Sequence, residues 1–310
     1  MGASSFEPRC TNSLEVLCAA GLVQHILVVN YETRIIPMYG RDEVAHKRAE
    51  FQGFSVRQRS IDYRSIHAHR IAALHGELLR IGRKFSNCPI IIDVSCLTKV
   101  HAIAVAEWLS EREQSDPPVF VCYSSPESYS WDVGNSVLRG EFRELVFCPI
   151  GGMNEDDRDP VGMRSMVDVI ALLGHEGGRA LYAMSGIDVE RGLCVLFDDP
   201  LNETPGSVAR VENSTLIGRI LKNKLGDWSY FPTVNGDLSD LHTRVSRFVL
   251  NSASNRQVII PLGPKVAIVQ SALAALSVGH GDIWVSYPVP NSYVWPYSYG
   301  VGQLRFFEAV

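Results

Sequence analysis

Short continuous apolar runs alternate along the chain with segments whose apolar residues recur at helical spacing. In the first half, the apolar runs are residues 25–31, 89–93 and 119–123, and each is typical of a strand buried on both faces. Residues 66–81 and 100–109, which lie between these runs, carry apolar residues with the period of a helix. Strands and helices that alternate in this way predict a parallel α/β unit.

The second half of the chain predicts the same order of elements. Helices are expected over residues 163–173, 216–225, 240–250 and 266–277, and strands over residues 180–184, 193–197, 258–261 and 283–287. Residues 41–64 are polar and rich in basic side chains, and residues 151–160 combine Gly, acidic residues and Pro as a linker does. We therefore predict an α/β protein of two Rossmann-like parallel-sheet units, residues 1–150 and 151–310.

The two halves also resemble each other in detail. Residues 89–131 and 258–295 each contain an apolar run, a short loop ending in lysine, an apolar helical stretch, a second apolar run and an aromatic tail. The matched tail positions are Tyr123 with Tyr287, Pro126 with Pro290, Ser128 with Ser292, Tyr129 with Tyr293, and Trp131 with Trp295. We interpret this match as an internal duplication, which predicts two units packed about a pseudo-twofold axis as a pseudo-dimer. The alternative is that the repeat only records how the fold arose.

Composition and charge narrow the class of protein. A hydrophobic fraction of 46% and a charged fraction of 20% are typical of a globular protein, and the net charge of −5 argues against a dedicated nucleic-acid binder. The 7 cysteines are widely spaced without a C-x-x-C pair, so neither a zinc site nor a disulfide framework is indicated, and a cytoplasmic protein with reduced thiols is expected. No secretory signal or membrane-spanning run is apparent, and we expect no membrane partner and no sequence-specific DNA binding.

Four loops are predicted to follow strands of the sheets. They are Asn30 to Glu32 with Tyr31, Asp93 to Lys99, Ser185 to Asp188 with Gly186, and Leu262 to Lys265. In open parallel sheets, ligands bind beyond the carboxyl ends of the strands. The residues of these loops are therefore the candidates for binding a ligand.

The two loops that end in lysine are the main candidates for binding a phosphate. In the first, Ser95 or Thr98 can cap the following helix, whose first N–H groups favour an anion, and Lys99 adds a positive charge. In the second, Gly263 allows a close backbone approach and Lys265 supplies the charge. A well-capped helix with a surface lysine is the alternative interpretation of either loop.

The aromatic tails offer a second kind of contact. Tyr129 and Trp131 in the first half, and Tyr293 and Trp295 in the second, have flat faces on which a nucleotide base can stack. Such stacking contributes about 1–3 kcal/mol per base. Packing within a core or an interface is the alternative role for these side chains.

Familiar cofactor and catalytic signatures are absent from the sequence. There is no G-x-x-x-x-G-K-[ST] loop, no G-x-G-x-x-G after a first strand, no G-x-S-x-G elbow and no H-E-x-x-H. We expect no cofactor and no metal, because His67, His69 and His75 are more simply explained as a solvated face of one helix. Asp93 can activate a water or hold a ribose hydroxyl, or it can serve as a helix cap.

The segment Asp93-x-Ser95-x-x-Thr98-Lys99 between a strand and a helix resembles the ligand loop of CRISPR-associated Rossmann-fold (CARF) domains. In that family a loop ending in Thr-Lys follows a parallel strand, and two domains together bind a cyclic oligoadenylate on their twofold axis. The first half lacks the glycine pair of that loop, and the second half has Gly263-Pro264-Lys265 in place of Thr-Lys. Ser185-Gly186 and the Gly-Pro-Lys segment also resemble segments of α/β proteins of prokaryotic antiviral systems. The resemblance implies a nucleotide sensor of antiviral defence.

Three functions remain open at this point. The first is a protein that binds or senses a small nucleotide, cyclic or a dinucleotide, with Lys99 and Lys265 partly exposed and facing one site. The second is a metal-independent phosphodiesterase or ring nuclease, in which Asp93, Tyr31 or Ser95 positions the attacking group. The third is an accessory subunit of a larger defence complex, whose aromatic tails dock a protein partner.

Overall fold

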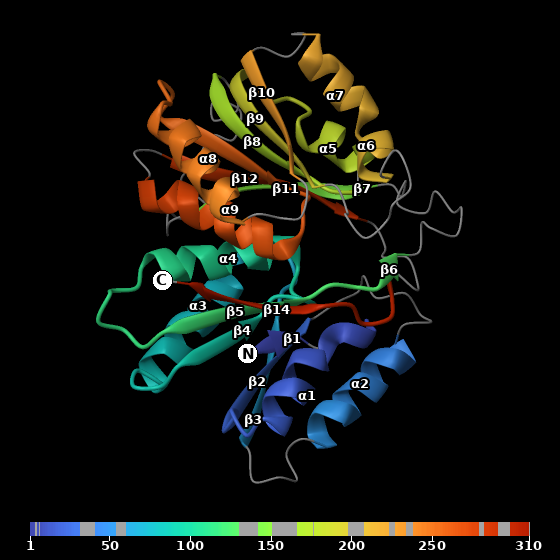
Figure 1. Cartoon of the computed structure of the whole chain (residues 1–310), viewed down its shortest axis with the longest axis vertical. Coiled ribbons are helices and arrows are strands. Elements are labelled where there is room, and N and C mark those ends of the chain that lie inside the picture. The colour runs from blue at the N-terminus through green and yellow to red at the C-terminus, as the bar shows by residue number, and fades with distance from the viewer. Residues whose placement is uncertain are drawn as a thin grey trace. The chain divides into compact units, whose positions relative to one another are not determined.

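The chain forms two α/β units (Figure 1). The computed structural model describes all residues except 4, 6, 32–40, 54–59, 130–141, 151–165, 176, 198–207, 223–226, 234–237, 279–281, 291–297 and 310. Unit 1 comprises Met1–His101, Arg112–Glu141 and Pro290–Val310, and unit 2 comprises Ala102–Glu111 and Phe142–Val289. Within the described part of the chain, no helix combines the length and apolarity that crossing a membrane requires.

Unit 1 contains most of the N-terminal elements and the C-terminal strands. Its strands are β1 (Gly2–Ala3), β2 (His25–Tyr31), β3 (Ser60–Ile66), β4 (Ile90–Asp93), β5 (Val119–Ser124), β6 (Ser128–Tyr129), β13 (Ser298–Tyr299) and β14 (Leu304–Ala309). Its helices are the short 3₁₀ helix η1 (Pro8–Cys10), α1 (Asn12–Ala19), α2 (Arg41–Gly53) and α3 (Ile71–Lys84). Helix α4 (Lys99–Ser110) begins in unit 1 and continues into unit 2.

The short strand β1 joins the two halves of the unit 1 sheet. It pairs with β2 in parallel, and β2 pairs with β3 in parallel. On its other side, the nitrogen of Met1 lies 2.5 Å from the carbonyl oxygen of Ile91, and the Asp93 N–H donates to the Met1 carbonyl at 2.7 Å. The assigned sheets are β1-β2-β3 and β14-β5-β4, and the two hydrogen bonds of Met1 join them in the order β3-β2-β1-β4-β5-β14. Among the assigned pairs in this order, only that of β14 with β5 is antiparallel.

Unit 2 contains one six-stranded sheet in the order β10-β9-β8-β11-β12-β7. Its strands are β7 (Phe142–Pro149), β8 (Val167–Leu173), β9 (Val189–Phe197), β10 (Asp227–Thr233), β11 (Arg256–Pro261) and β12 (Asp282–Pro290). Its helices are α5 (Gly177–Ala183), α6 (Val208–Glu212), α7 (Ser214–Leu221), α8 (Leu238–Leu250) and α9 (Lys265–Val278). The five strands from β10 to β12 in this order are parallel to their neighbours.

The sequence of the central strand β8 does not alternate between apolar and polar residues, and the burial of the strand explains why. All of its residues are buried, so both of its faces are apolar except for Asp168. The buried carboxylate of Asp168 is compensated by Arg191, whose Nη2 lies 2.7 Å from Oδ2, and by the Ser252 hydroxyl at 2.6 Å. A charge inside a sheet requires such partners, because burying it alone would be costly.

Both units have the same strand order. In each, the first strand (β1 or β8) is central, the next two strands lie on one side of it, and the fourth and fifth lie on the other. Because parallel crossovers are right-handed, this order places helices on both faces of a sheet. Figure 1 shows α1 and α2 on one face of the unit 1 sheet and α3 on the other, and α5 to α7 opposite α8 and α9 in unit 2. The order reverses beside the first strand, which is where ligands of open α/β sheets bind.

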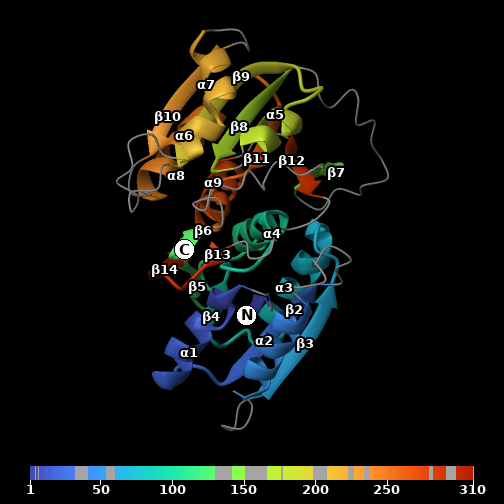
Figure 2. The same cartoon turned by 90° about the vertical axis from the view of Figure 1, so that its right-hand side faces the viewer.

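The similarity in the order of elements between the two halves extends beyond the fifth strand of each unit. After β5 and β6, the chain supplies β7 to the sheet of unit 2, where the Ile150 N–H donates to the Ile283 carbonyl at 2.8 Å. After β12, it supplies β14 to the sheet of unit 1. The Ser-Tyr dipeptides of β6 and β13 pair with each other in antiparallel fashion (Figure 2). This shared order is what a duplication would leave, and the duplication itself stays a prediction.

Several sequence-based assignments differ from the structure. Residues 163–173, expected as a helix, contain strand β8, and residues 180–184, expected as a strand, lie largely in helix α5. The polar stretch 41–64 contains helix α2 and most of strand β3. The expected helix over residues 66–81 begins only at Ile71, so His67 and His69 precede it.

The boundary between the units also differs from the prediction. Residues 290–310 belong to unit 1 and not to the second unit, because β14 pairs with β5 and β13 pairs with β6. The chain passes from unit 1 to unit 2 at residues 141–142, and residues 102–111 also belong to unit 2, so neither unit is one continuous stretch of chain. The expected linker 151–160 lies outside the described residues.

Candidate ligand-binding loops at the carboxyl edges of the sheets

The carboxyl edge of the unit 1 sheet is formed by the loops that follow its parallel strands. Tyr31 ends β2, Asp93 ends β4, and Ser124 ends β5. Hydrogen bonds of these residues connect the loop that follows one strand to the loop that follows the next. Tyr31, Asp93, Ser95 and Thr98, which are predicted site residues of the first half, therefore meet at one edge, as the strand order requires.

Asp93 is buried and accepts hydrogen bonds on both carboxylate oxygens. Its Oδ1 accepts from the Ser95 N–H at 2.8 Å, and its Oδ2 accepts a short hydrogen bond from the Ser13 hydroxyl. The first contact is the local side-chain-to-backbone turn that Asp often makes two residues ahead. Asp93 therefore fixes the start of the loop and holds it to the beginning of α1.

Ser95 is fully buried and connects the loop to β5. Its hydroxyl oxygen accepts the N–H of Ser124 at 2.7 Å. The Ser124 hydroxyl in turn accepts from the Asn12 amide at 3.0 Å. The Ser95 hydroxyl is thus buried and bonded within the protein, and a role of Ser95 in binding a ligand stays a prediction.

Thr98 caps helix α4. Its hydroxyl accepts the N–H of His101 at 3.2 Å, three residues ahead, which is the bond of an N-cap residue. The same hydroxyl donates to the carbonyl oxygen of Ala68 at 2.8 Å. One of the two capping residues expected from the sequence is thus identified, and its hydroxyl proton is held by the β3–α3 loop.

The Thr98 backbone N–H is bound by Tyr31. The Tyr31 hydroxyl oxygen lies 3.1 Å from the Thr98 nitrogen and 3.1 Å from Nδ1 of His101. The two rings are stacked with centroids 5.3 Å apart. The other ring nitrogen of His101, Nε2, lies 3.1 Å from the carbonyl oxygen of Arg70. His101 is fully buried, and burial lowers its pKa to about 3 and raises the pKa of Tyr31 above its ordinary value.

Lys99 and Asn30 lie at the same edge and are only partly buried. Lys99 is the first residue of α4, so its side chain starts at the positive end of the helix dipole. Its partial exposure confirms that part of the prediction for the lysine loops. Lys265 is likewise partly exposed and is the first residue of α9.

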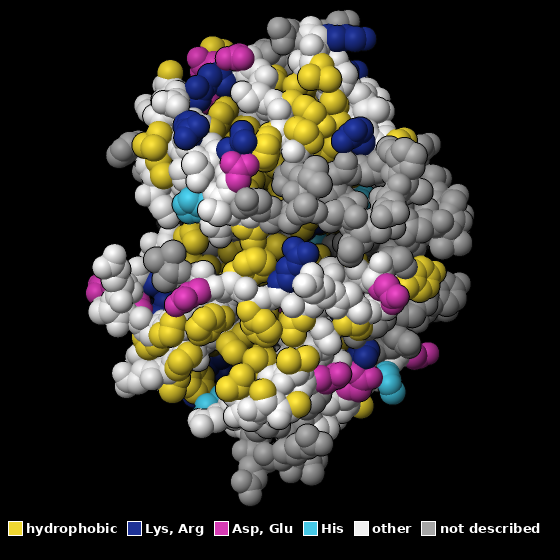
Figure 3. Space-filling model, viewed as in Figure 1, with side chains coloured by type: hydrophobic (Ala, Val, Ile, Leu, Met, Phe, Trp, Pro, Cys, Tyr) yellow, Lys and Arg dark blue, Asp and Glu magenta, His cyan; other side chains and the backbone are white. Residues whose placement is uncertain are grey.

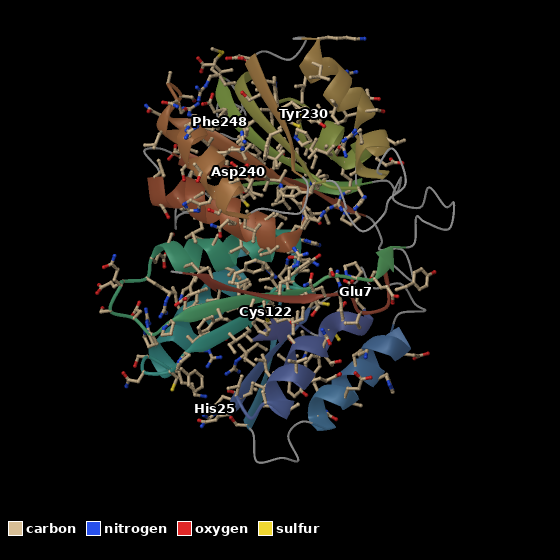
Figure 4. All side chains as sticks on the ribbon, viewed as in Figure 1. Glu7, His25, Cys122, Tyr230, Asp240 and Phe248 are labelled. Carbon is tan, nitrogen blue, oxygen red and sulfur yellow. The ribbon has the colours of Figure 1, made fainter. Side chains whose placement is uncertain are left out.

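A buried ion pair at the end of β5 was not predicted. Nε and Nη2 of Arg9 lie 2.9 and 2.7 Å from Oε2 of Glu7, and Nη1 donates to the Ser124 carbonyl at 2.9 Å. Oε2 of Glu7 also accepts from the Ser298 hydroxyl at 2.8 Å. Figure 4 labels Glu7 beside this edge of unit 1. In the sequence, a charged pair two residues apart near the N-terminus gives no sign of burial.

The carboxyl edge of unit 2 is closely packed at two glycines. A Cβ on Gly174, which follows β8, would lie 2.7 Å from the carbonyl oxygen of Leu262. A Cβ on Gly263 would lie 2.8 Å from the ring of Phe197. The loops after β8 and β11 therefore touch where the strand order reverses. The close neighbour of Gly263 is the Phe197 ring, and the approach of a ligand to its backbone stays a prediction.

The loop after β8 was missed by sequence reasoning. It begins at Gly174 and leads into α5, whose first two residues are Gly177 and Gly178, as a glycine-rich turn after a first strand does in Rossmann folds. Its carbonyl at Gly174 accepts from the amide of the buried residue Asn213 at 2.7 Å. The apolar run of β8 followed by three glycines was the signal, and it was hidden by the expectation of a helix there.

Ser185 and Gly186 are not at a carboxyl edge, so this prediction was wrong. They follow helix α5 and precede strand β9, which places them at the amino edge of the unit 2 sheet. Gly186 has φ of +76° and closes the helix, where the Ile187 N–H donates to the Met184 carbonyl at 3.2 Å. The segment is a helix end, and a ligand at the opposite edge would not reach it.

The aromatic tails and the shared site are not tested by the structure. Trp131, Tyr293 and Trp295 lie outside the described residues, and Tyr129 is described only by its backbone pairing with Ser298. That Lys99 and Lys265 face one site concerns the placement of one unit relative to the other, and it stays a prediction.

Comparisons with known proteins do not identify a family. No protein-family model and no curated protein matches the chain. Among solved structures, a universal stress protein from Pseudomonas aeruginosa UCBPP-PA14 is 12% identical, and the match covers 93% of this chain and 92% of that chain with a TM-score of 0.27. The α/β architecture with parallel sheets is established by the strand pairing itself.

Proposed function

We propose that the chain binds a small nucleotide through the loops that open α4 and α9, and that it acts as a nucleotide sensor. The observation that carries the proposal is the position of the two lysines. In both units the fourth strand of the sheet ends beside the reversal of strand order, and the chain then enters a helix whose first residue is a partly exposed lysine.

This arrangement suits a phosphate for general physical reasons. The first N–H groups of a helix have no partners within the helix, and its dipole favours negative charge at that end. A lysine at the first position adds a full charge to that partial one. The resemblance to CARF loops makes a cyclic oligoadenylate the first ligand to test, and a role in antiviral defence is part of the same proposal.

The contacts favour binding over hydrolysis. A phosphodiesterase in this loop would need Asp93, Tyr31 or Ser95 to position an attacking group. Both carboxylate oxygens of Asp93, the Tyr31 hydroxyl and the Ser95 hydroxyl already accept or donate hydrogen bonds within the protein. These groups hold the loops in place, which is the role that a binding protein requires of them.

Thermal unfolding with a panel of mono-, di- and cyclic nucleotides, cyclic tetra-adenylate included, tests the proposal. A ligand that binds the folded state stabilises it and therefore raises the melting temperature. At a ligand concentration 100 times the dissociation constant, the stabilisation is about 2.7 kcal/mol. Lys99→Ala or Lys265→Ala should reduce that rise.

Two lysines at the other ends of their units serve as matched controls. Lys84 ends α3 and Lys222 follows α7, so both lie at the amino edges of the sheets. Lys84→Ala and Lys222→Ala should leave the ligand-induced rise intact. If no nucleotide at millimolar concentration shifts the melting temperature of the wild type, the proposal fails.

A further inference from the structure

Tyr31 and His101 form a chain of hydrogen bonds whose proton positions follow from the geometry. Nε2 of His101 lies 3.1 Å from the Arg70 carbonyl oxygen, which can only accept, so Nε2 carries the ring proton. A neutral imidazole has one ring proton, and Nδ1 is therefore an acceptor. The Tyr31 hydroxyl, 3.1 Å from Nδ1, donates to it.

This direction leaves the Tyr31 oxygen with its lone pairs for the Thr98 N–H, 3.1 Å away. The neutral state of His101 agrees with its complete burial, which lowers its pKa to about 3. The chain runs in one sense, from the Thr98 N–H through the Tyr31 hydroxyl to Nδ1 of His101, and from Nε2 to the Arg70 carbonyl.

The chain connects the three loops that surround the start of α4. Tyr31 ends β2, Arg70 lies in the β3–α3 loop, and Thr98 precedes Lys99 in the β4–α4 loop. A second bond in parallel, from the Thr98 hydroxyl to the Ala68 carbonyl, ties the same two loops together at 2.8 Å. Thr98, the residue before Lys99, is thus held by hydrogen bonds of both its backbone N–H and its side-chain hydroxyl.

We propose that Tyr31 and His101 are positioning residues of the unit 1 loop, which hold Thr98 and therefore fix where Lys99 enters the ligand site. This inference rests on the proposed function for its ligand, and it assigns to Tyr31 a role behind the loop in place of a direct ligand contact. His101 receives a role that its position inside an apolar helix does not suggest.

The closest test removes one oxygen atom. Tyr31→Phe keeps the ring stacked on His101 and takes away the group that joins Thr98 to His101. One net hydrogen bond corresponds to roughly a 3- to 10-fold change in an equilibrium. We therefore expect the Thr98 amide to exchange with solvent roughly 3- to 10-fold faster, and cyclic tetra-adenylate to bind more weakly by a similar factor. Tyr182→Phe, which alters a 40% exposed tyrosine of α5, is the matched control and should change neither.

A measurement on the wild type tests the chain without any variant. The ¹⁵N shifts of the His101 ring should show a protonated Nε2, an unprotonated Nδ1 and no titration between pH 5 and 8. A protonated Nδ1, or an unchanged Thr98 exchange rate in Tyr31→Phe, would overturn the inference. If the wild type does not bind cyclic tetra-adenylate but both of these readouts are as expected, the ligand is wrong and the positioning role stands.

Discussion

The loops at the carboxyl edge of unit 1 are held by polar side chains that bond to one another, and most of these side chains are buried. Asp93, Ser95 and Ser124 form a continuous set of contacts from α1 to β5, and Tyr31 and His101 form a second set from β2 to α4. Buried polar groups require partners, since an unpaired one costs about 1–3 kcal/mol. The sequence identified Asp93, Ser95, Thr98 and Tyr31 as important but could not distinguish a group that binds a ligand from one that binds the protein.

Replacing Asp93 should lower stability more than replacing an exposed aspartate. Asp93→Ala leaves the buried Ser95 N–H without its acceptor and removes the contact to Ser13, so we expect a loss of about 1–3 kcal/mol in the free energy of unfolding. Asp62→Ala, in a partly exposed pair with Lys84 at 3.3 Å, is the control and should change that free energy little. Urea unfolding measures both, and equal effects would contradict the structural role of Asp93.

His101 makes the stability of unit 1 depend on pH. Its pKa is lowered from 6.5 to about 3 in the folded protein, with burial as the main cause and His67 and His69 adding repulsion when they are charged. Between these pH values the unfolded chain binds a proton that the folded chain does not, so stability is complete above pH 6.5 and falls as the pH is lowered towards 3. Chemical unfolding at several pH values should show this decline and a weaker one in His101→Gln. An identical decline in the variant would show that other groups cause it.

At the scale of elements, the βαβ units were predicted well where a short apolar run marks the strand and a longer apolar stretch marks the helix. The segments β4–α4–β5 and β11–α9–β12 were predicted in order and close to their observed bounds. The failures include the stretch 41–64, which contains α2 and most of β3, and the first strand and helix of unit 2, β8 and α5. A strand buried on both faces has no alternation, and a short apolar run of this kind cannot be told from a buried helix by its period.

The contact between the loops after β8 and β11 gives a prediction at this scale. Gly174→Ala would place a Cβ 2.7 Å from the Leu262 carbonyl oxygen, and because that neighbour is backbone the strands must shift. We expect a loss of about 1–3 kcal/mol in the free energy of unfolding. Gly218→Ala in α7 meets nothing within 4 Å and should stabilise by up to about 1 kcal/mol, since alanine favours a helix. A neutral Gly174→Ala would show that the loops are not packed as described.

At the scale of the whole chain, the N-terminal and C-terminal strands both belong to unit 1. The N-terminal strand β1 lies between β2, with which it pairs, and β4, to which Met1 is hydrogen-bonded, and the C-terminal strand β14 lies at the edge beyond β5. Figure 3 shows hydrophobic side chains gathered on the face of unit 1 seen there, and Phe306 of β14 is 44% exposed. A boundary near residue 150 was inferred from the linker-like composition of residues 151–160, and composition carries no information on which sheet a later strand joins.

Removing β14 should therefore affect the first unit and not the second. Deleting residues 303–310 leaves the edge of β5 without the antiparallel partner that it has over Val119 to Ser124. We expect amides of β5 to exchange faster with solvent, because their bonds to β14 are lost. Amides of β8 and β11 are the internal control, and faster exchange there instead of in β5 would contradict the assignment of β14.

The central claim is that Lys99 and Lys265 bind the phosphates of a nucleotide. Titration calorimetry with the panel member that gives the largest thermal shift, on the wild type and on Lys99→Ala, Lys265→Ala and Lys84→Ala, tests it most directly. A charge-assisted contact is worth about 1.5–3 kcal/mol, so we predict that either loop variant binds about tenfold more weakly or worse and that Lys84→Ala binds as the wild type does. An affinity unchanged in both loop variants would contradict the claim.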